Sequence, residues 1–150
     1  MSIRIKKFGY NEKELFKIAH NIRDDVFIKE QNVPKKIEFD GQDDDATHYL
    51  IFDDITPVAT ARWRITDNGI KLERFAVIKS YRNKGYGNLI LTEILADVKP
   101  YEKTIYLNAQ TEAIHFYERH GFVKQGDEFL EADIKHYQMI FVESENYMIN

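Results

Sequence analysis

Residues 77–95, VIKSYRNKGYGNLILTEIL, place a basic, glycine-containing turn between an apolar run and a long amphipathic run. The turn holds the cations Arg82 and Lys84 beside Gly85 and Gly87. A helix N-terminus offers N–H groups without helical partners and a positive dipole end, and glycine lets a ligand approach that backbone closely. The stretch therefore predicts a strand, a phosphate-binding turn and a helix.

Two common phosphate loops do not fit this turn. A Walker A loop continues with Lys and then Ser or Thr after its last glycine, whereas Gly87 is followed by Asn88. A dinucleotide fingerprint needs a further glycine where this chain has Ile90. The pattern that remains is Arg82-x-x-Gly85-x-Gly87 between a strand and a helix.

Apolar patterning on both sides of the turn predicts an α+β fold with a mixed, mostly antiparallel sheet. The runs typical of strands are residues 2–8, 47–53, 57–66, 69–78, 103–109, 121–131 and 134–142. The runs with helical spacing are residues 11–31, interpreted as two helices, the residues from the turn to Pro100, and residues 111–121. The predicted order is β-α-α-β-β-β-α-β-α-β-β, with about six to seven strands and about four helices. Residues 35–46 are polar and rich in turn formers, so we expect a loop there.

Composition limits the class of protein. With 150 residues, 43% of them hydrophobic, the chain can bury one substantial core, so we expect a single domain over residues 1–150. It has no cysteine and no apolar run as long as a membrane span, and we expect a soluble, cytoplasmic protein that does not bind membranes. The net charge of −4 argues against nucleic-acid binding, which depends on a basic face.

Acidic side chains gather in residues 38–54, which contain no Lys or Arg. Neither Asp40 nor Asp43 begins the ligand pattern of a calcium-binding loop, so we expect no metal site. Our interpretation is an acidic loop near the entrance for an amine acceptor. A solvated loop without that role is equally consistent with the pattern.

The turn resembles the pyrophosphate loop of the GNAT family of acyl-CoA-dependent N-acyltransferases, (Gln/Arg)-x-x-Gly-x-(Gly/Ala). Two flanking segments strengthen the resemblance: LERFAV, residues 72–77, before the turn, and AIHFYERHGF, residues 113–122, after it. The order of elements agrees with the family over residues 2–142. Residues 26–50 also look like the N-terminal signature of the ElaA/YjcF-like branch.

The resemblance implies an acetyl-CoA-dependent N-acetyltransferase that transfers acetyl directly to a primary amine. By position, the cosubstrate would contact the strand at Phe75, Ala76 and Val77. The residues that match the pyrophosphate loop are Arg82, Asn83, Lys84, Gly85, Tyr86 and Gly87. In isolation, a solvated basic turn that caps a helix is the better interpretation of such a turn, and the flanking segments favour the phosphate-binding interpretation.

Three side chains near the turn are candidates for chemistry or for cofactor contacts. Tyr117 matches the family tyrosine that protonates the departing CoA thiolate, and a buried core tyrosine is the alternative. The family often has an asparagine that contacts the pantetheine, and here that role is open between Asn108 and Gln110.

Glu73 is our candidate for the general base. It precedes Phe75 by two residues, so strand alternation predicts that both lie on one face. A solvent-exposed glutamate, or an ion pair with an arginine of residues 61–64, explains Glu73 equally well. No spacing singles out a histidine.

The acidic segment favours a cationic acceptor, either a small molecule or a peptide, without identifying it. A non-catalytic acyl-CoA-binding sensor or interaction module on the same fold is the alternative function. Exposed strand edges would allow a homodimer.

Overall fold

The computed structural model describes residues 2–142 as a seven-stranded sheet with helices on both faces. The strand order is β1-β2-β3-β4-β5-β7-β6, and every neighbouring pair is antiparallel except β4 and β5. The strands are β1 (Ile3–Gly9), β2 (Thr47–Asp53), β3 (Thr56–Thr66), β4 (Gly69–Val77), β5 (Ile105–Gln110), β6 (Phe122–Glu131) and β7 (Ile134–Phe141). The predicted α+β fold with a mixed, mostly antiparallel sheet is confirmed.

The helices differ from the prediction near the N-terminus. The α-helices are α1 (Lys13–Arg23), α2 (Lys35–Glu38), α3 (Tyr86–Val98) and α4 (Ile114–Glu118). A π-helical segment, η1 (Asp24–Glu30), continues α1 where a second helix was predicted. The loop predicted over residues 35–46 is wrong at its start, where α2 forms. Three short 3-10 turns are η2 (Lys79–Tyr81), η3 (Lys99–Tyr101) and η4 (Thr111–Ala113).

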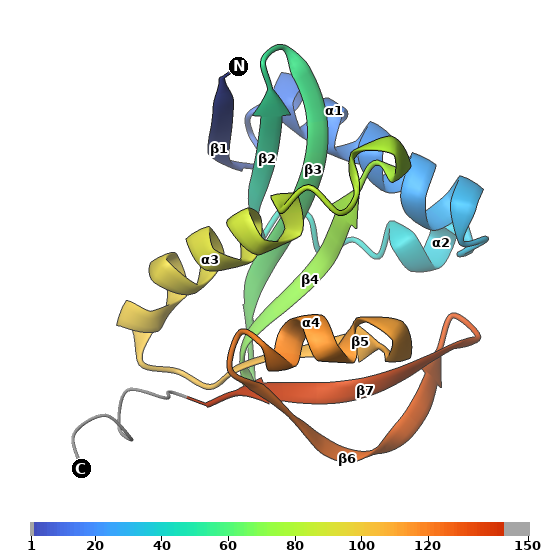
Figure 1. The fold of residues 1–150 in the computed structure, drawn as a ribbon, viewed down its shortest axis with the longest axis vertical. Helices are drawn as coiled ribbons and strands as arrows, with labels where there is room; N and C mark the ends of the chain where they lie inside the picture. The colour runs from blue at the N-terminus through green and yellow to red at the C-terminus, as the bar shows by residue number, and fades with distance from the viewer. Residues whose placement is uncertain (1, 143–150) are drawn as a thin grey trace.

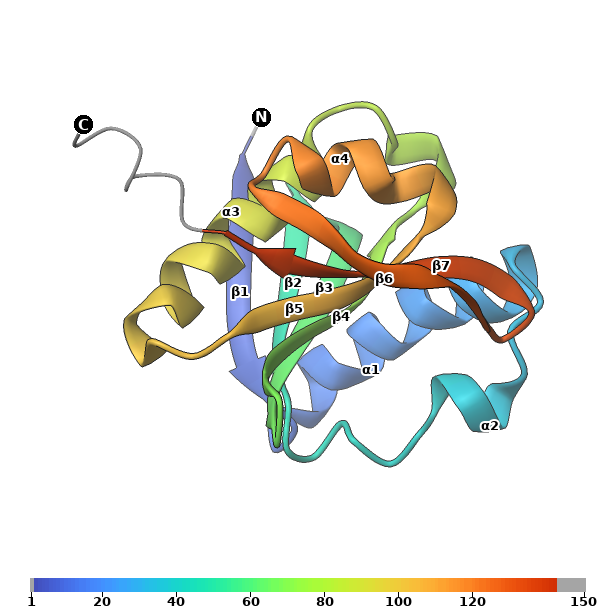
Figure 2. The ribbon, with the colours of Figure 1, turned by 90° about the horizontal axis from the view of Figure 1, so that it is seen from below.

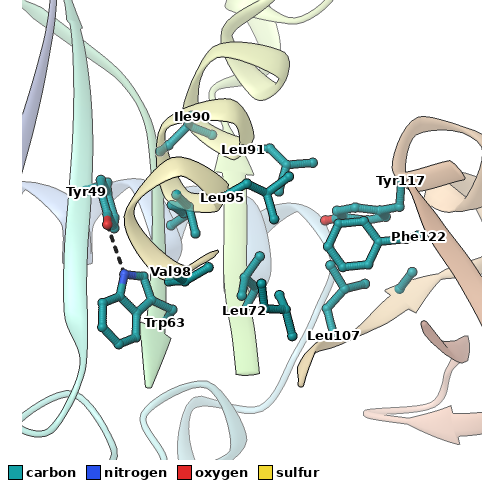
Figure 3. Packing of buried hydrophobic residues seen from close by; sticks show 14 of the residues in the cluster. Tyr49, Trp63, Leu72, Ile90, Leu91, Leu95, Val98, Leu107, Tyr117 and Phe122 are labelled. Carbon is teal, nitrogen blue, oxygen red and sulfur yellow. Dashed lines mark hydrogen bonds between the residues drawn. The ribbon is translucent and has the colours of Figure 1, made fainter. Parts of the chain in front are cut away.

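Two apolar clusters join the helices to the sheet. Buried residues of α3 and α4 pack with inward-facing residues of the central strands on one face. Residues of α1 and η1 pack on the other face, so the sheet is the middle layer (Figures 1 and 2). Figure 3 shows α3 seated between the Tyr49–Trp63 pair and Leu72. No helix within residues 2–142 is long and apolar enough to cross a bilayer.

The sheet opens between β4 and β5. Their parallel pairing extends only from Ile70 to Leu72 on β4 and from Ile105 to Leu107 on β5. Beyond these residues β4 runs up and away from β5 and β7 (Figure 1). The C-terminal part of β4 therefore has an edge that β5 does not cover, and this is where the predicted site lies.

Candidate functional site

The turn between β4 and α3 has the backbone of an anion-binding site. α3 begins at Tyr86, and its N-cap Gly85 has a φ of 89°. No side chain caps the helix and its first turn has no acidic residue, so the first N–H groups lack side-chain acceptors. A Cβ placed on Gly85 would meet no atom within 4 Å. Space therefore lies open at Gly85, where a phosphate group could meet these donors.

Arg82, a predicted phosphate ligand, is engaged within the protein. Its terminal nitrogens donate to the two carboxylate oxygens of Glu30, each at 2.7 Å, and Nε donates to the Val77 carbonyl at 2.9 Å. The pair ties η1 to the turn. Lys84 is exposed, with Nζ 5.5 Å from the centre of the Tyr81 ring. Lys84 is thus the cation of the motif that an incoming anion can reach without breaking an ion pair.

The remaining side chains of the turn point in different directions. Tyr86 is 8% exposed, and its hydroxyl donates to the carboxylate of Asp53 on β2. Asn83 is exposed, with a φ of 64°. A Cβ on Gly87 would lie 3.4 Å from the Phe116 ring. Tyr86 can therefore offer a ligand only its backbone, and Gly87 lets α3 pack closely against α4.

A β-bulge decides which way the side chains of β4 point. The pairing of β3 with β4 shifts between Thr60 and Arg62, and Arg74 at the shift has a φ of 59°. Phe75 packs against the core beneath α3 and α4, whereas Glu73 lies beside Arg62 on the opposite face. The prediction that Glu73 and Phe75 share a face is therefore wrong, because the extra residue reverses the alternation.

A cavity of about 200 Å³ opens where β4 and β5 separate. The predicted site residues that line it are Glu73, Phe75, Asn108, Gln110 and Tyr117. The predicted residues outside the lining are Ala76, Val77, Arg82, Asn83, Lys84, Gly85, Tyr86 and Gly87. The structure thus separates the predicted residues into the turn before α3, with the strand end that leads to it, and a cavity lined by other residues.

Tyr117 is held in the core beside the cavity. It is 8% exposed, and its ring makes edge contacts with Phe75 and Phe122 at centroid distances of 6.0 and 5.9 Å (Figure 3). Within residues 2–142 its hydroxyl has no hydrogen-bond partner. Burial raises the pKa of Tyr117 well above its usual range. The hydroxyl therefore keeps its proton at neutral pH and has an unused donor, as a general acid requires.

Glu73 lies in a cluster of cations. Its carboxylate accepts hydrogen bonds from Arg62 at 3.1 Å and Arg64 at 2.7 Å, and Lys71 lies 3.1 Å away. Burial alone would raise the pKa of Glu73, but the Arg64 hydrogen bond and the charges of Arg62 and Lys71 outweigh it and lower the pKa to about 2. The ion-pair alternative is therefore present, and a carboxylate with this pKa is a weak general base.

Glu73→Gln is expected to lower the free energy of unfolding by about 3 kcal/mol at neutral pH, because three cations lose their shared carboxylate. The folded pKa of about 2 lies below the ordinary value of 4.5, so the wild-type advantage is complete above pH 4.5 and is lost as the pH falls toward 2. Urea unfolding at pH 7 and at pH 3 measures this loss. Glu112→Gln, at an exposed position, is the control and should change stability by less than about 0.5 kcal/mol. If wild type and Glu73→Gln differ in free energy of unfolding by the same amount at pH 7 and at pH 3, the expectation is contradicted.

The acidic segment after α2 lies against arginines. Glu38, 1% exposed, binds Arg23 and also accepts from Arg74 Nε at 2.8 Å. Asp43, 8% exposed, accepts from Arg23 at 2.7 Å and Arg62 at 2.6 Å. The charges of Glu38 and Asp43 are already paired, so these two carboxylates are poorly placed to attract amines. Asp44 and Asp45 of the same segment are exposed, and the role of the segment in attracting amines stays a prediction. Among the described residues no group of His, Asp and Glu could hold a metal ion.

Asn108 and Gln110 both point toward the cavity from β5. Gln110 Nε2 donates to Gln31 Oε1 at 2.9 Å, and Asn108 Nδ2 donates to Glu131 Oε1 at 3.3 Å. Asn108 Oδ1 is buried and has no hydrogen-bond partner. Either side chain can reach a ligand in the cavity, so the choice between them stays a prediction.

Sequence reasoning missed several polar residues of the cavity, among them Glu131 on β6 and His136 on β7. β7 pairs with β5 so that His136 lies opposite Gln110. β6 pairs with β7 so that Glu131 lies opposite Ile134. The pairing of β6 with β7 follows from the short turn between Glu131 and Ile134. The pairing of β5 with β7 joins segments that are distant in the sequence, so no local pattern places His136 beside Gln110.

The arrangement of strand, glycine turn and helix has a counterpart in known proteins. An acetyltransferase (GNAT) domain model matches residues 8–142. The chain belongs to the GNAT acetyltransferase family. The prediction from the turn and its flanking segments is therefore confirmed, and the parting of β4 and β5 lies within the matched region.

Individual relatives of this GNAT protein agree with the predicted branch. It is 42% identical over 132 residues to a Bacillus subtilis (strain 168) protein named uncharacterized N-acetyltransferase YjcF, covering 87% of this chain and 94% of the relative. It matches the structure of Escherichia coli ElaA with a TM-score of 0.85 and 25% identity, covering 94% of this chain and 100% of that one. An acyl-CoA N-acyltransferase from Pseudomonas aeruginosa matches with a TM-score of 0.83 and 26% identity, again covering 94% and 100%.

Proposed function

We propose that this GNAT protein transfers the acetyl group of acetyl-CoA to the nitrogen of a primary amine. The observation that supports this most is the uncapped N-terminus of α3, with open space at Gly85. α3 meets α4 through Gly87 and Phe116, and Phe116 is the neighbour of Tyr117. The turn proposed to bind phosphate is thus linked through this contact to the helix of Tyr117, the proposed acid.

The residues present fit coenzyme A. The N–H groups at the start of α3, from Gly85 to Gly87, would bind the diphosphate, with Lys84 adding charge. Asn83 lies beside them in solvent. Arg82 would support the turn through Glu30 rather than contact the diphosphate with an unpaired charge.

The uncovered edge of β4 fits the pantetheine arm. β5 pairs with β4 only as far as Leu72, so the backbone of Phe75, Ala76 and Val77 has no strand beside it on that side. An extended ligand can take the place of a strand at such an edge. A backbone N–H there would also stabilise charge on the thioester oxygen, and Asn108 or Gln110 would contact the arm.

Acetyl-CoA supplies a thioester carbonyl that is activated toward attack. The amine nitrogen forms a bond to the carbonyl carbon, the carbon–sulfur bond breaks, and the sulfur leaves with the proton of the Tyr117 hydroxyl. The nitrogen gives up one proton, which restores the tyrosine. A thiol has a pKa of about 8.5 and an ordinary phenol a pKa of about 10, and burial raises the pKa of Tyr117 further. The transfer to sulfur is therefore uphill, and the phenolate readily takes up a proton again.

The attacking amine must be neutral. For an acceptor with a pKa of about 10.4, holding it neutral at neutral pH costs about 4.6 kcal/mol, so a proton acceptor in the cavity would raise the rate. Glu73 is no longer the favoured proton acceptor, because three cations occupy its carboxylate.

Calorimetric titration with acetyl-CoA, with ATP and NADH as controls, tests the proposal. We expect acetyl-CoA to bind with a Kd below about 1 mM and the controls not to bind. Thiol release is then measured with a panel of primary amines. Failure to bind acetyl-CoA would overturn the proposal, whereas binding without thiol release from any amine would favour the acyl-CoA sensor.

A further inference from the structure

Three polar side chains meet in the cavity on neighbouring strands. Asn108 of β5, Glu131 of β6 and His136 of β7 all line it, together with Tyr117. β5 and β7 pair with Gln110 opposite His136, so Asn108 and His136 lie diagonally on one side of the sheet. His136 is 5% exposed, and its ring stacks on the ring of Phe129 of β6 at a centroid distance of 5.8 Å. The three side chains are held by the sheet and not by a mobile loop.

The hydrogen bonds of His136 identify its free nitrogen. Nδ1 lies 2.7 Å from the carbonyl oxygen of Ile134, and a carbonyl can only accept, so Nδ1 carries a proton. In the neutral ring Nε2 is then an acceptor. Nε2 lies 3.8 Å from Glu131 Oε2, which is too far for a hydrogen bond. In the neutral ring both atoms are acceptors, so neither can donate to the other.

The cluster has acceptors that lack a donor. Asn108 gives its amide N–H to Glu131, which leaves Oδ1 buried without a partner. Glu131 has no Lys or Arg partner within residues 2–142, whereas Glu38 and Glu73 of the same cavity are paired with cations. The Glu131 carboxylate, which is partly exposed, thus lies next to both the Asn108 amide and His136 Nε2. None of the three side chains has a cationic donor from Lys or Arg within residues 2–142.

We propose that Asn108, Glu131 and His136 form the subsite for the ammonium group of a monoamine acceptor, and that His136 Nε2 removes its proton. An ammonium has three N–H donors and no acceptor, which matches the cluster. When an N–H bond of the ammonium breaks, its electron pair stays on the nitrogen, which becomes the neutral nucleophile. His136 later releases the proton to solvent. The catalytic part rests on the proposed acetyl transfer.

The other residues of the cavity determine which molecule can carry the amine. The apolar side chains of the lining are Phe27, Val33, Ile37, Leu72, Phe75, Leu107, Ala113, Ala132 and Ile134. Its cations are Lys71 and Arg74, and its other carboxylates are already paired. A second ammonium would find no free carboxylate, so the acceptor has one amine on an apolar body and is not a polyamine.

Binding is tested without acetyl-CoA by histidine side-chain nitrogen NMR. The probes are hexylamine and 1,6-diaminohexane in phosphate buffer, because Tris is itself a primary amine. His136→Gln assigns the His136 signals among the five histidines. We expect a saturable shift of the His136 Nε2 signal with hexylamine, and binding of the diamine that is weaker by about tenfold or more.

Two glutamates of β6 make a matched pair of variants. Glu131→Gln should weaken hexylamine binding by about tenfold or more, since the charged acceptor is lost. Glu128→Gln, at an exposed position outside the cavity, should leave it unchanged. Equal hexylamine binding by the two variants, or equal binding of hexylamine and the diamine by the wild type, would overturn the inference.

Catalysis is tested with acetyl-CoA and hexylamine, with the acetamide measured by mass spectrometry. His136→Gln should lower turnover by about a hundredfold while acetyl-CoA affinity stays at the wild-type value. Acetyl-CoA binding with no effect of hexylamine on His136 would overturn this inference and leave the proposed function standing. Hexylamine binding without acetyl-CoA binding would support the subsite and overturn the proposed function.

Discussion

Gly85→Glu is expected to weaken acetyl-CoA binding by at least about a hundredfold. The new side chain would occupy the open space at the N-terminus of α3, where the diphosphate is proposed to bind. Its carboxylate would accept from the same N–H groups and repel the phosphates. Calorimetric titration of wild type and variant with acetyl-CoA measures the change.

Gly126→Glu is the matched control for that experiment. Gly126 on β6 has a φ of 82° and Gly85 has a φ of 89°, and a Cβ on either would meet no atom within 4 Å. The two variants therefore carry the same new charge and comparable backbone strain. The control should bind acetyl-CoA as the wild type does. If the two variants bind equally, the turn at Gly85 is not the phosphate site.

Tyr117→Phe is expected to lower turnover by about a hundredfold or more, the usual contribution of a positioned general acid. Acetyl-CoA affinity should stay within about twofold of wild type, because the proposed binding contacts come from the turn and the edge of β4. Thermal stability should also be retained, since the hydroxyl has no hydrogen-bond partner within residues 2–142. Thiol release, calorimetry and thermal unfolding measure the three quantities.

Tyr49→Phe separates catalysis from packing. Tyr49 belongs to the same apolar cluster, but its hydroxyl donates to Asp97 at 2.6 Å and accepts from Trp63 at 2.9 Å (Figure 3). Its loss should cost about 1–2 kcal/mol of stability and leave turnover unchanged. A Tyr117→Phe protein with wild-type turnover would show that the tyrosine is a core residue and not the acid.

Three features could be predicted from the sequence: the order of the elements, the antiparallel pairing from β2 to β4 and the turn before α3. Each of these depends on neighbouring residues. Apolar periodicity sets whether a segment is a strand or a helix, and Gly85 marks a turn whose backbone other residues disfavour. For the same reason, the family resemblance could be drawn from short segments around the turn.

The cavity itself could be predicted only in part. Tyr117, Asn108 and Gln110 were expected near a ligand because they match family positions, and the structure brings all three to one cavity. Arg82 was expected to face phosphate, yet Glu30, far away in the sequence, holds its side chain. Ion pairs of this kind leave no local pattern.

What the sequence determined by itself is most of the local structures and the turn that is proposed to bind an anion. What tertiary structure alone decided is which side chains share the cavity. The bulge at Arg74 turns Glu73 toward cations, and strand pairing brings His136 to the cavity wall. The physical reason is that a strand's side-chain direction follows from its register with its neighbours, and register depends on residues far along the chain.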